Sequence, residues 1–385
     1  MRIGINTLFM VPGDVGGTEV YLRNTLSAMA AQETDNILVL FTNRENDSLL
    51  RKDLADYPTV EFYQLSCRAS IRPFRILVEQ FSLPFIAKKY NVDVLWSPGY
   101  TAPAFCFSPQ AVTICDLQYK SYPEDMSSIE RKTLDALVRT ACKRCDAVIT
   151  ISEFSRQEVI KYNFAQGDKV FAVPLGVTKN FSCSVSDDIS AADSVHILQK
   201  MGIENPFLLC VAHTYPHKNV DKLVDAFCLL EENLPHQLVL VGKARRGENA
   251  VQASLANIKN SKRAVRLSGL SDTELQVLYK NADVFVLPSS YEGFGLPVVE
   301  AMMAELPVIT PKMASLPEVG GEYAFYVNSP EPSSFVQQIS HVLTLPKKQR
   351  DKHICDARKW AAGFTWEQTA LQTVKVLESI TRKNK

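Results

Sequence analysis

The sequence predicts an α/β protein built from two doubly wound, Rossmann-like domains. Short runs of apolar, often β-branched residues alternate with longer segments of helical periodicity, the pattern of a parallel sheet flanked by helices. The 385 residues exceed the length at which a single hydrophobic core stops growing, so two domains are expected. A Ser- and Asp-rich stretch of weak periodicity near the middle of the chain separates two such alternations.

Each half of the chain supplies its own set of expected strands. The apolar runs of the first half predict strands at residues 2–10, 37–42, 60–65, 94–96, 111–114, 147–152 and 170–173. Those of the second half predict strands at residues 207–212, 237–241, 264–268, 284–287, 307–310 and 323–327. Open α/β sheets bind ligands at the carboxyl ends of their strands, so functional residues are expected in the loops that follow strands.

The domain borders follow from this alternation. Residues 1–178 are expected to form the N-terminal domain, 179–204 a linker region, and 205–364 the C-terminal domain. Residues 365–385 are helical and amphipathic, and we expect this last helix to pack back on the N-terminal domain.

Composition excludes several classes of protein. Lys plus Arg and Asp plus Glu both number 42, so the basic excess of a general nucleic-acid binder is absent. The apolar runs are too short for a membrane-spanning helix, and the first residues read as a strand rather than a signal peptide. Nine scattered cysteines suit reduced thiols, and we interpret Cys142 and Cys145 as half-buried residues closing a helix rather than a zinc or redox site. A cytoplasmic protein is expected.

The strongest motif is PSSYEGFGLPVVEAMMAELPVI, which follows an apolar strand. Gly293 and Gly295 let backbone amides approach an anion closely, and a helix that begins near Pro297 directs its positive end to the same place. Carboxylates repel phosphate but accept hydrogen bonds from sugar hydroxyls, so Glu292 and Glu300 suit a sugar on one side and a ribose on the other. The competing interpretation is a capping carboxylate beside a tight turn.

The whole block closely resembles the donor-site signature of glycosyltransferase family 4, the large retaining family with a GT-B fold, and in particular its members of the bacterial polysaccharide-assembly type. The family pattern is E-x(7)-E around GFGLP. The resemblance extends along nearly the whole chain through GDVGGTEVYLRNTL, VTICDLQYKSYPE, VAHTYPHKN, LVGKARRG and RLSGLSDTEL, in family order. It implies two domains facing a common cleft, with the donor held by the C-terminal one.

The resemblance also implies roles for individual residues. Gly16 and Gly17 would approach the donor diphosphate from the N-terminal domain, and Lys218 would pair with its phosphates; the alternative for Lys218 is a solvated residue at a helix start. Lys243 is a second candidate cation, while His213 and His217 are either imidazolium ions near phosphate or loop fillers. The remaining donor-binding candidates are Ser268, Gly269 and Leu270, which would frame the base, and Phe294, Leu296 and Pro297 of the donor motif.

Two departures from the family pattern stand out. Cys115, followed by Asp116, occupies the position of the family histidine that contacts the donor sugar, and a thiol is a weak donor and acceptor. Either activity or donor preference changes, or a neighbour takes over the role; a nucleophilic thiolate is a further alternative. Glu305 stands where a glycine is usual, which implies a modified helix end.

The resemblance implies retaining transfer of a hexose without a metal or other cofactor, and the chain agrees in that it has no Asp-x-Asp motif. A UDP-hexose such as UDP-glucose is the favoured donor because it is common in the family, and the expected acceptor is a glycan or lipid-linked oligosaccharide. Alternatives are a GDP-mannose-dependent mannosyltransferase and a catalytically weak nucleotide-sugar-binding protein. A phosphorylase or epimerase of the same fold and a dinucleotide oxidoreductase lack supporting motifs; the oxidoreductase spacing G-x-G-x-x-G is absent.

Residues 61–90 suggest a contact with the cytoplasmic face of the membrane. This stretch carries five cations interleaved with aromatic residues: Arg68, Arg72, Arg75, Lys88 and Lys89, with Phe74, Phe81 and Phe85. It could form a basic amphipathic surface that meets a lipid-linked acceptor. The alternative is a solvated rim around a buried helix.

Overall fold

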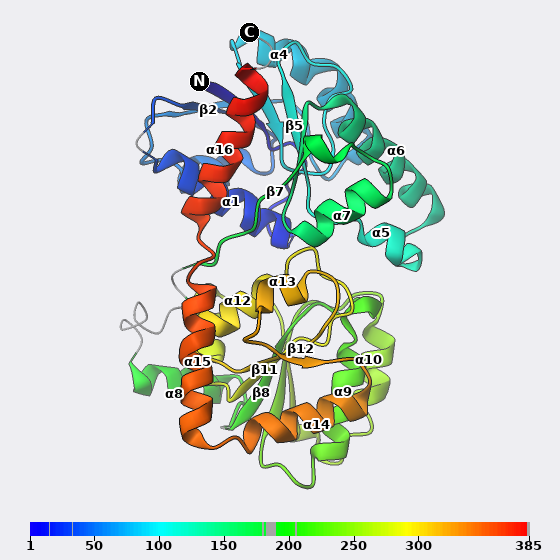
Figure 1. Ribbon diagram of the computed structural model, residues 1–385, viewed down its shortest axis with the longest axis vertical. Helices are drawn as coiled ribbons and strands as arrows, with labels where there is room; N and C mark the ends of the chain where they lie inside the picture. The colour runs from blue at the N-terminus through cyan, green and yellow to red at the C-terminus, as the bar shows by residue number, and fades with distance from the viewer. Residues whose placement is uncertain (15, 33, 179–180, 182–189, 205, 383–385) are drawn as a thin grey trace. The chain divides into compact units, whose positions relative to one another are not determined.

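The chain forms two compact units (Figure 1). This computed structural model describes residues 1–14, 16–32, 34–178, 181, 190–204 and 206–382. The first unit comprises Met1–Gly176 together with Thr365–Lys385, and the second comprises Val177–Phe364. Each unit is built on a parallel sheet with helices around it, which confirms the predicted doubly wound α/β class.

The sheet of the first unit has seven strands in the order β3-β2-β1-β4-β5-β6-β7. The strands are β1 Arg2–Asn6, β2 Ile37–Thr42, β3 Val60–Gln64, β4 Val94–Ser97, β5 Gln110–Ile114, β6 Ala147–Thr150 and β7 Val170–Ala172. β1 is shorter than expected because the chain turns after Asn6, where the Leu8 amide donates to the Asn6 side chain and the Met10 amide to the Thr7 carbonyl.

The sheet of the second unit has six strands in the order β10-β9-β8-β11-β12-β13. The strands are β8 Phe207–Val211, β9 Gln237–Val241, β10 Ala264–Leu267, β11 Val284–Val286, β12 Val308–Pro311 and β13 Phe325–Val327. In both sheets the order runs outward in opposite directions from a central pair, β1 with β4 and β8 with β11. Ligands of doubly wound folds bind outside the carboxyl ends of that pair.

Helices complete both units. Those of the first unit are α1 Gly17–Ala30, α2 Asp47–Asp53, α3 Arg72–Leu77, α4 Leu83–Lys89, α5 Gln118–Ser121, α6 Ser128–Arg144, α7 Glu153–Lys161 and α16 Trp366–Arg382. Those of the second unit are α8 Ala191–Lys200, α9 Val220–Leu230, α10 Glu248–Leu255, α11 Asp272–Asn281, α12 Leu296–Met303, α13 Leu316–Gly320, α14 Pro332–Leu343 and α15 Lys347–Ala361. A π-helical turn, Val78–Ser82, joins α3 to α4.

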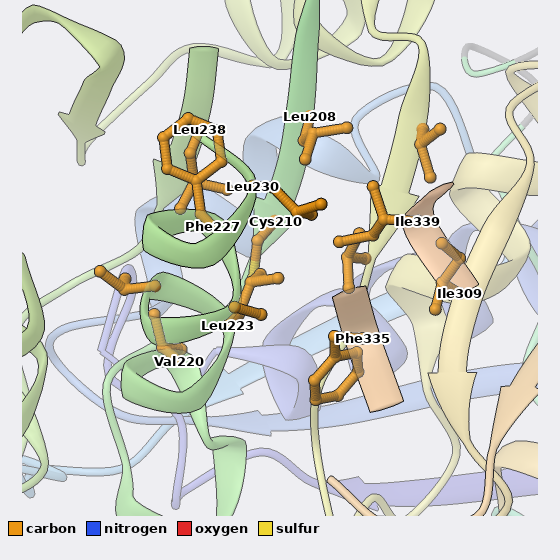
Figure 2. Packing of buried hydrophobic residues seen from close by; sticks show 14 of the residues in the cluster. Leu208, Cys210, Val220, Leu223, Phe227, Leu230, Leu238, Ile309, Phe335 and Ile339 are labelled. Atoms are coloured by element: carbon orange, nitrogen blue, oxygen red, sulfur yellow. The ribbon is translucent and has the colours of Figure 1, made fainter. Parts of the chain in front are cut away.

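The core of the second unit explains why its strands could be predicted from the sequence. Strands covered on both faces carry continuous apolar runs. One hydrophobic cluster joins Leu208 and Leu238 of the sheet with Phe227 and Leu230 of α9 and with Phe335 of α14 (Figure 2). These side chains are at most 5% exposed, so buried apolar packing between the helices and the sheet holds the strands in place.

Two expectations about the chain's organisation need comment. The expected linker, 179–204, contains a helix: α8 begins after Ser190, whose hydroxyl accepts from the Asp193 amide, and it contacts α11. Its short apolar face was too weak a signal beside the Ser- and Asp-rich stretch, of which 179–180 and 182–189 lie outside the described residues. The expected C-terminal helix is α16, which lies against α1 and donates from Thr369 to the Pro174 carbonyl at 2.8 Å.

The Cys142 and Cys145 pair lies at the end of α6 in a hydrophobic cluster of the first unit. Both residues are fully buried rather than half-buried. Burial raises the pKa of the Cys142 thiol to about 12, so it is a neutral core residue.

Candidate active site

Two loops of the second unit meet at the carboxyl edge of its sheet. One follows β8 and contains residues 212–219; the other follows β11 and contains residues 287–295. Asn219, in the left-handed conformation with φ 49° at the start of α9, donates to the Pro288 carbonyl at 3.0 Å and to the Ser290 hydroxyl at 2.6 Å. The Ser290 amide donates back to the His217 carbonyl at 2.8 Å. These bonds hold the two loops in one arrangement.

Lys218 and Glu292 are brought together by this arrangement. The Lys218 Nζ lies 2.7 Å from Glu292 Oε2, and the two side chains are only 18% and 14% exposed. The Ser315 hydroxyl lies 2.8 Å from both the Glu292 and Phe294 carbonyls, which fixes the backbone of the second loop. The donor motif suggested Glu292 and the family resemblance implied Lys218 beside the donor, but neither predicted that the two form an ion pair with each other.

The helix that follows the second loop begins at Leu296, one residue before Pro297. Its N-cap, Gly295, has φ 105°, a conformation that L side chains rarely adopt, and a Cβ at this position would also lie 3.1 Å from Leu316. Glycine is therefore required for the turn that aims α12 at the edge of the sheet. The positive end of the helix and the Lys218 ammonium thus occupy one region, which suits an anion.

Glu300 lies one turn into α12 and is partly buried. Its Oε2 accepts from the Tyr279 hydroxyl at 3.0 Å. Burial raises the pKa of Glu300 to about 7, which the Tyr279 hydrogen bond opposes and Asp272 reinforces. Tyr279 was missed by sequence reasoning, because on α11 it reads as one more apolar-face residue of an amphipathic helix.

The two candidate histidines are neutral. Burial, followed by the nearby cations Arg245, Lys218 and Lys243, lowers the pKa of His213, whose Nδ1 accepts from the Lys243 amide at 3.1 Å. Burial and Lys218 lower the pKa of His217 to about 3. These surroundings favour neutral imidazoles that shape the loop over imidazolium ions.

His217 instead forms part of the loop's interior. It is 2% exposed and stacks on the Tyr215 ring, with ring centroids 5.7 Å apart and planes inclined by 19°. His213 is fixed by the close approach of the loop after β9: a Cβ at Gly242 would lie 2.1 Å from the Ala212 carbonyl oxygen. Both rings therefore shape the loop that presents Lys218.

A cationic cluster was only partly recognised from the sequence. Lys243 is exposed and Arg245 partly buried, and both cations act on His213. The Arg245 amide donates to the Thr214 hydroxyl at 2.7 Å, which ties the cluster to the loop that carries Lys218. The motif LVGKARRG was the available signal for Arg245, and only its lysine, Lys243, was singled out.

The three residues expected to frame a base follow β10 at the same edge of the sheet. Ser268 and Gly269 are exposed, Leu270 is partly exposed, and Gly269 has φ 69°. The neighbouring loop is bound to the end of this strand, since the Gly242 amide donates to the Leu267 carbonyl at 2.9 Å.

The remaining candidates lie in the first unit, where α1 and β5 bring them together. Gly16 caps α1 with φ 56° and ψ −129°, a conformation suited to glycine, and Gly17 is the first helical residue. The Cys115 thiol, which follows β5, is hydrogen bonded to the side chains of Thr18 and Tyr100. The glycine turn and Cys115 therefore share one region of this unit.

Cys115 has the character of an inert thiol. It is 5% exposed, and burial, reinforced by Asp116, raises its pKa to about 12. The Asp116 carboxylate accepts from the Gln118 amide at 3.1 Å. A nucleophilic thiolate needs a lowered pKa, so the nucleophile hypothesis is not supported by these surroundings.

Comparison with known proteins connects this geometry to a family. Residues 15–181 match the model of Glycosyltransferase Family 4, and residues 197–360 match that of Glycosyl transferases group 1. The O-antigen chain mannosyltransferase B of Escherichia coli is 31% identical over 320 residues, which cover 80% of this chain and 81% of that protein. The chain belongs to glycosyltransferase family 4.

Other proteins similar to this family 4 glycosyltransferase support the same family and fold. The O-antigen chain mannosyltransferase RfbU of Salmonella typhimurium is 27% identical over 265 residues, covering 69% of each chain. The solved structure of a sucrose-phosphate synthase from Thermosynechococcus elongatus has the same fold, with a TM-score of 0.78, 19% identity and full coverage of both chains. The GT-B fold expected from the donor motif is thereby confirmed. No described helix of the glycosyltransferase is both long and apolar enough to span a bilayer.

Proposed function

We propose that this glycosyltransferase transfers mannose from GDP-mannose to a glycan or lipid-linked oligosaccharide in polysaccharide synthesis. The observation that carries the donor class is the Lys218–Glu292 pair beside the start of α12, with Glu300 one turn further on. An ammonium and a helix N-terminus suit a diphosphate, and carboxylates suit the hydroxyls of the sugars on either side of it.

Mannose is favoured by the relatives rather than by a residue of the site. Two of them, from Escherichia coli and Salmonella typhimurium, are named as O-antigen chain mannosyltransferases. The preference for a UDP-hexose stated above rests on its frequency in the family alone. GDP-mannose, the alternative considered there, therefore becomes the proposal.

The proposed mechanism is retaining and metal-independent. As the anomeric C–O bond breaks, negative charge grows on the β-phosphate, and Lys218 with the amide end of α12 stabilises that charge. The departing phosphate oxygen accepts the proton of the acceptor hydroxyl as the new C–O bond forms on the same face. Glu292 binds sugar hydroxyls and forms no bond to the anomeric carbon.

Nucleotide binding tests the proposal directly. Ligands of the native state raise the unfolding temperature in proportion to the logarithm of their concentration over Kd. We expect GDP and GDP-mannose to stabilise the full chain more than UDP and UDP-glucose at equal concentrations. A larger shift with the uridine compounds would restore the UDP-hexose alternative, and no shift with any of the four would overturn the donor site.

Product analysis tests the reaction. With GDP-mannose and an oligosaccharide acceptor, proton NMR of the fresh product should show the anomeric configuration of the donor, and EDTA should leave the rate unchanged. An inverted product or loss of activity in EDTA would contradict the mechanism. The catalytically weak alternative predicts binding without transfer or donor hydrolysis.

A further inference from the structure

An outward-facing apolar stripe runs along the helical segment from α3 to α4 in the first unit. Five large apolar residues recur at intervals of three or four along it: Ile71, Phe74, Leu77, Phe81 and Phe85. Phe81 is 69% exposed and Phe85 is 61% exposed, whereas Leu83 and Ala87 on the other side of the segment are buried. The segment thus has apolar side chains facing both the core and the solvent, unlike an ordinary amphipathic surface helix.

A second segment extends the stripe. Phe105 and Phe107 are exposed, and the Phe107 ring lies 5.4 Å from that of Phe85 and 5.0 Å from that of Phe105, measured between centroids. Every exposed phenylalanine among the described residues belongs to these two segments. A contiguous group of this kind marks an interaction surface rather than the scattered apolar exposure of any protein.

Cations border the apolar residues. Arg68, Arg72, Lys88 and Lys89 are exposed, and the Lys88 ammonium lies over the Phe107 ring, 4.2 Å from its centroid. The one acidic residue between positions 62 and 92 is Glu79, which is fully buried and accepts hydrogen bonds from Asn6 and Thr101. Glu130 approaches Arg72 at 3.5 Å in an exposed pair and Glu45 interacts electrostatically with Arg68, so Lys88 and Lys89 dominate the field at the stripe among the described residues.

We propose that this surface docks on an anionic lipid bilayer. Its members, called the docking surface below, are Ile71, Phe74, Leu77, Phe81, Phe85, Phe105 and Phe107 with the cations Arg68, Arg72, Lys88 and Lys89. Aromatic side chains enter the boundary between headgroups and acyl chains, while lysine and arginine reach anionic headgroups from the rim. A second copy of the chain is a poorer occupant, because like-charged rims would face each other.

The docking surface contains none of the residues proposed to bind the donor. Its role in bringing the enzyme to a lipid-linked acceptor rests on the proposed function. An acceptor carried on a lipid remains at the membrane face, so an enzyme held there meets it by diffusion in two dimensions. Membrane recruitment is thereby placed on residues 68–107 of the first unit, while Lys218, Glu292 and Glu300 lie in the second unit.

Vesicle flotation of the full-length protein tests this proposal. The unaltered chain should float with phosphatidylglycerol-rich vesicles and not with vesicles of phosphatidylcholine alone. The double variant F81S/F85S should lose at least about tenfold in vesicle affinity, since two large apolar anchors are removed. Charge removal in K88Q/K89Q should cost about fivefold for each cation, corresponding to about 1 kcal/mol apiece.

Matched controls separate docking from folding. Leu229→Ser on α9 also removes a strongly exposed apolar side chain, 63% exposed, but should float like the unaltered chain. All variants should keep their unfolding temperature and the shift produced by GDP. Flotation of F81S/F85S equal to that of the unaltered chain, or no flotation at all, would overturn the docking surface while leaving the donor site intact.

The oligomeric state provides the last arm of the test. If the unaltered chain is a dimer by light scattering and F81S/F85S is a monomer, a second copy covers the stripe, and the lipid proposal is wrong. A monomer in both cases, together with lipid-dependent flotation, supports it. If GDP does not raise the unfolding temperature of the unaltered chain, that result counts against the proposed function alone.

Discussion

The Lys218 ammonium and the Glu292 carboxylate form a 2.7 Å ion pair across two loops of the second unit. Both groups are candidates for binding the donor, one its phosphates and the other its sugar. The two charges neutralise each other in this pair, so a diphosphate that binds here competes with Glu292 for the cation. The pair therefore predicts opposite effects on nucleotide and on nucleotide-sugar when one partner is removed.

Glu292→Gln should separate those two effects. GDP should bind as tightly or more tightly, since Lys218 loses a competing carboxylate, whereas transfer from GDP-mannose should fall about 10²-fold because a group that acts on the sugar is lost. Isothermal titration and steady-state kinetics measure the two quantities.

Lys218→Ala should weaken both GDP binding and transfer. The matched control is Lys222→Ala, in the first turn of α9, whose ammonium pairs with Glu331 at 2.9 Å away from the candidate site. Equal losses in both lysine variants would mean that general charge, and not the position of Lys218, attracts the nucleotide.

Donor binding should depend on pH through Glu300. Its pKa of about 7 lies above the ordinary 4.5, and only the ionised carboxylate accepts both hydroxyl protons of a ribose. The KM for the donor should therefore rise as the pH falls below about 7. Tyr279→Phe removes a hydrogen bond that lowers this pKa, so the profile should move to higher pH. An unchanged profile in Glu300→Gln would exclude Glu300 as its source.

The free energy of unfolding should also depend on pH through Glu300. Raising the pH is expected to improve donor binding but to lower the stability of the fold. Between pH 4.5 and 7 the folded chain retains a proton on Glu300 that the unfolded chain has lost, so raising the pH through this window destabilises the fold. The loss amounts to at most about 3 kcal/mol. Compared with the unaltered chain, Glu300→Gln should gain relative stability from pH 5 to pH 8 in urea titrations. A constant difference would contradict the raised pKa.

Glu305 provides a test of local strain. It ends α12 with φ 61°, where glycine is favoured, and its carboxylate pairs with Arg358 of α15 at 2.6 Å in a half-exposed site. Glu305→Gly relieves about 1 kcal/mol of backbone strain and loses an ion pair of about 0–1 kcal/mol. Glu305→Ala loses the pair and keeps the strain. The expected order of unfolding temperature is Gly at or above Glu, with Ala lowest; Ala above Gly would refute the account.

Cys115→Ser should retain activity within about fivefold, because a thiol whose pKa is raised to about 12 is not a nucleophile at neutral pH. Mass spectrometry after iodoacetamide should find the exposed Cys355 alkylated and Cys115 unmodified. Loss of transfer in Cys115→Ser with full alkylation of Cys115 would revive the nucleophile hypothesis.

The fold could be predicted from the sequence because buried parallel strands are continuous apolar runs. Each of the thirteen expected strands has an observed counterpart. Helix α8 was missed since its 10 residues follow a stretch without periodicity. The modified helix end expected at Glu305 now has a physical form: a left-handed residue whose carboxylate reaches Arg358.

The sequence predicted which residue types form the candidate site, but it did not predict their protonation or their hydrogen-bond partners. Spacing in the donor motif placed Glu292 and Glu300 near the backbone amides that are expected to bind phosphate. Protonation of His213 and His217 depends on burial by residues distant in sequence, and the Tyr279–Glu300 hydrogen bond joins two helices. Such properties arise only when the chain has folded, so no local pattern carries them.

The second unit leaves the first and returns to it through adjoining residues, since the Val177 amide donates to the Phe364 carbonyl at 3.0 Å. A domain whose two ends meet can be inserted into a host without stretching either connection. Residues 177–364 therefore behave as a cassette that carries Lys218, Glu292 and Glu300 together. Under the proposed function, exchange of that cassette between relatives is expected to transfer the nucleotide preference in one genetic step.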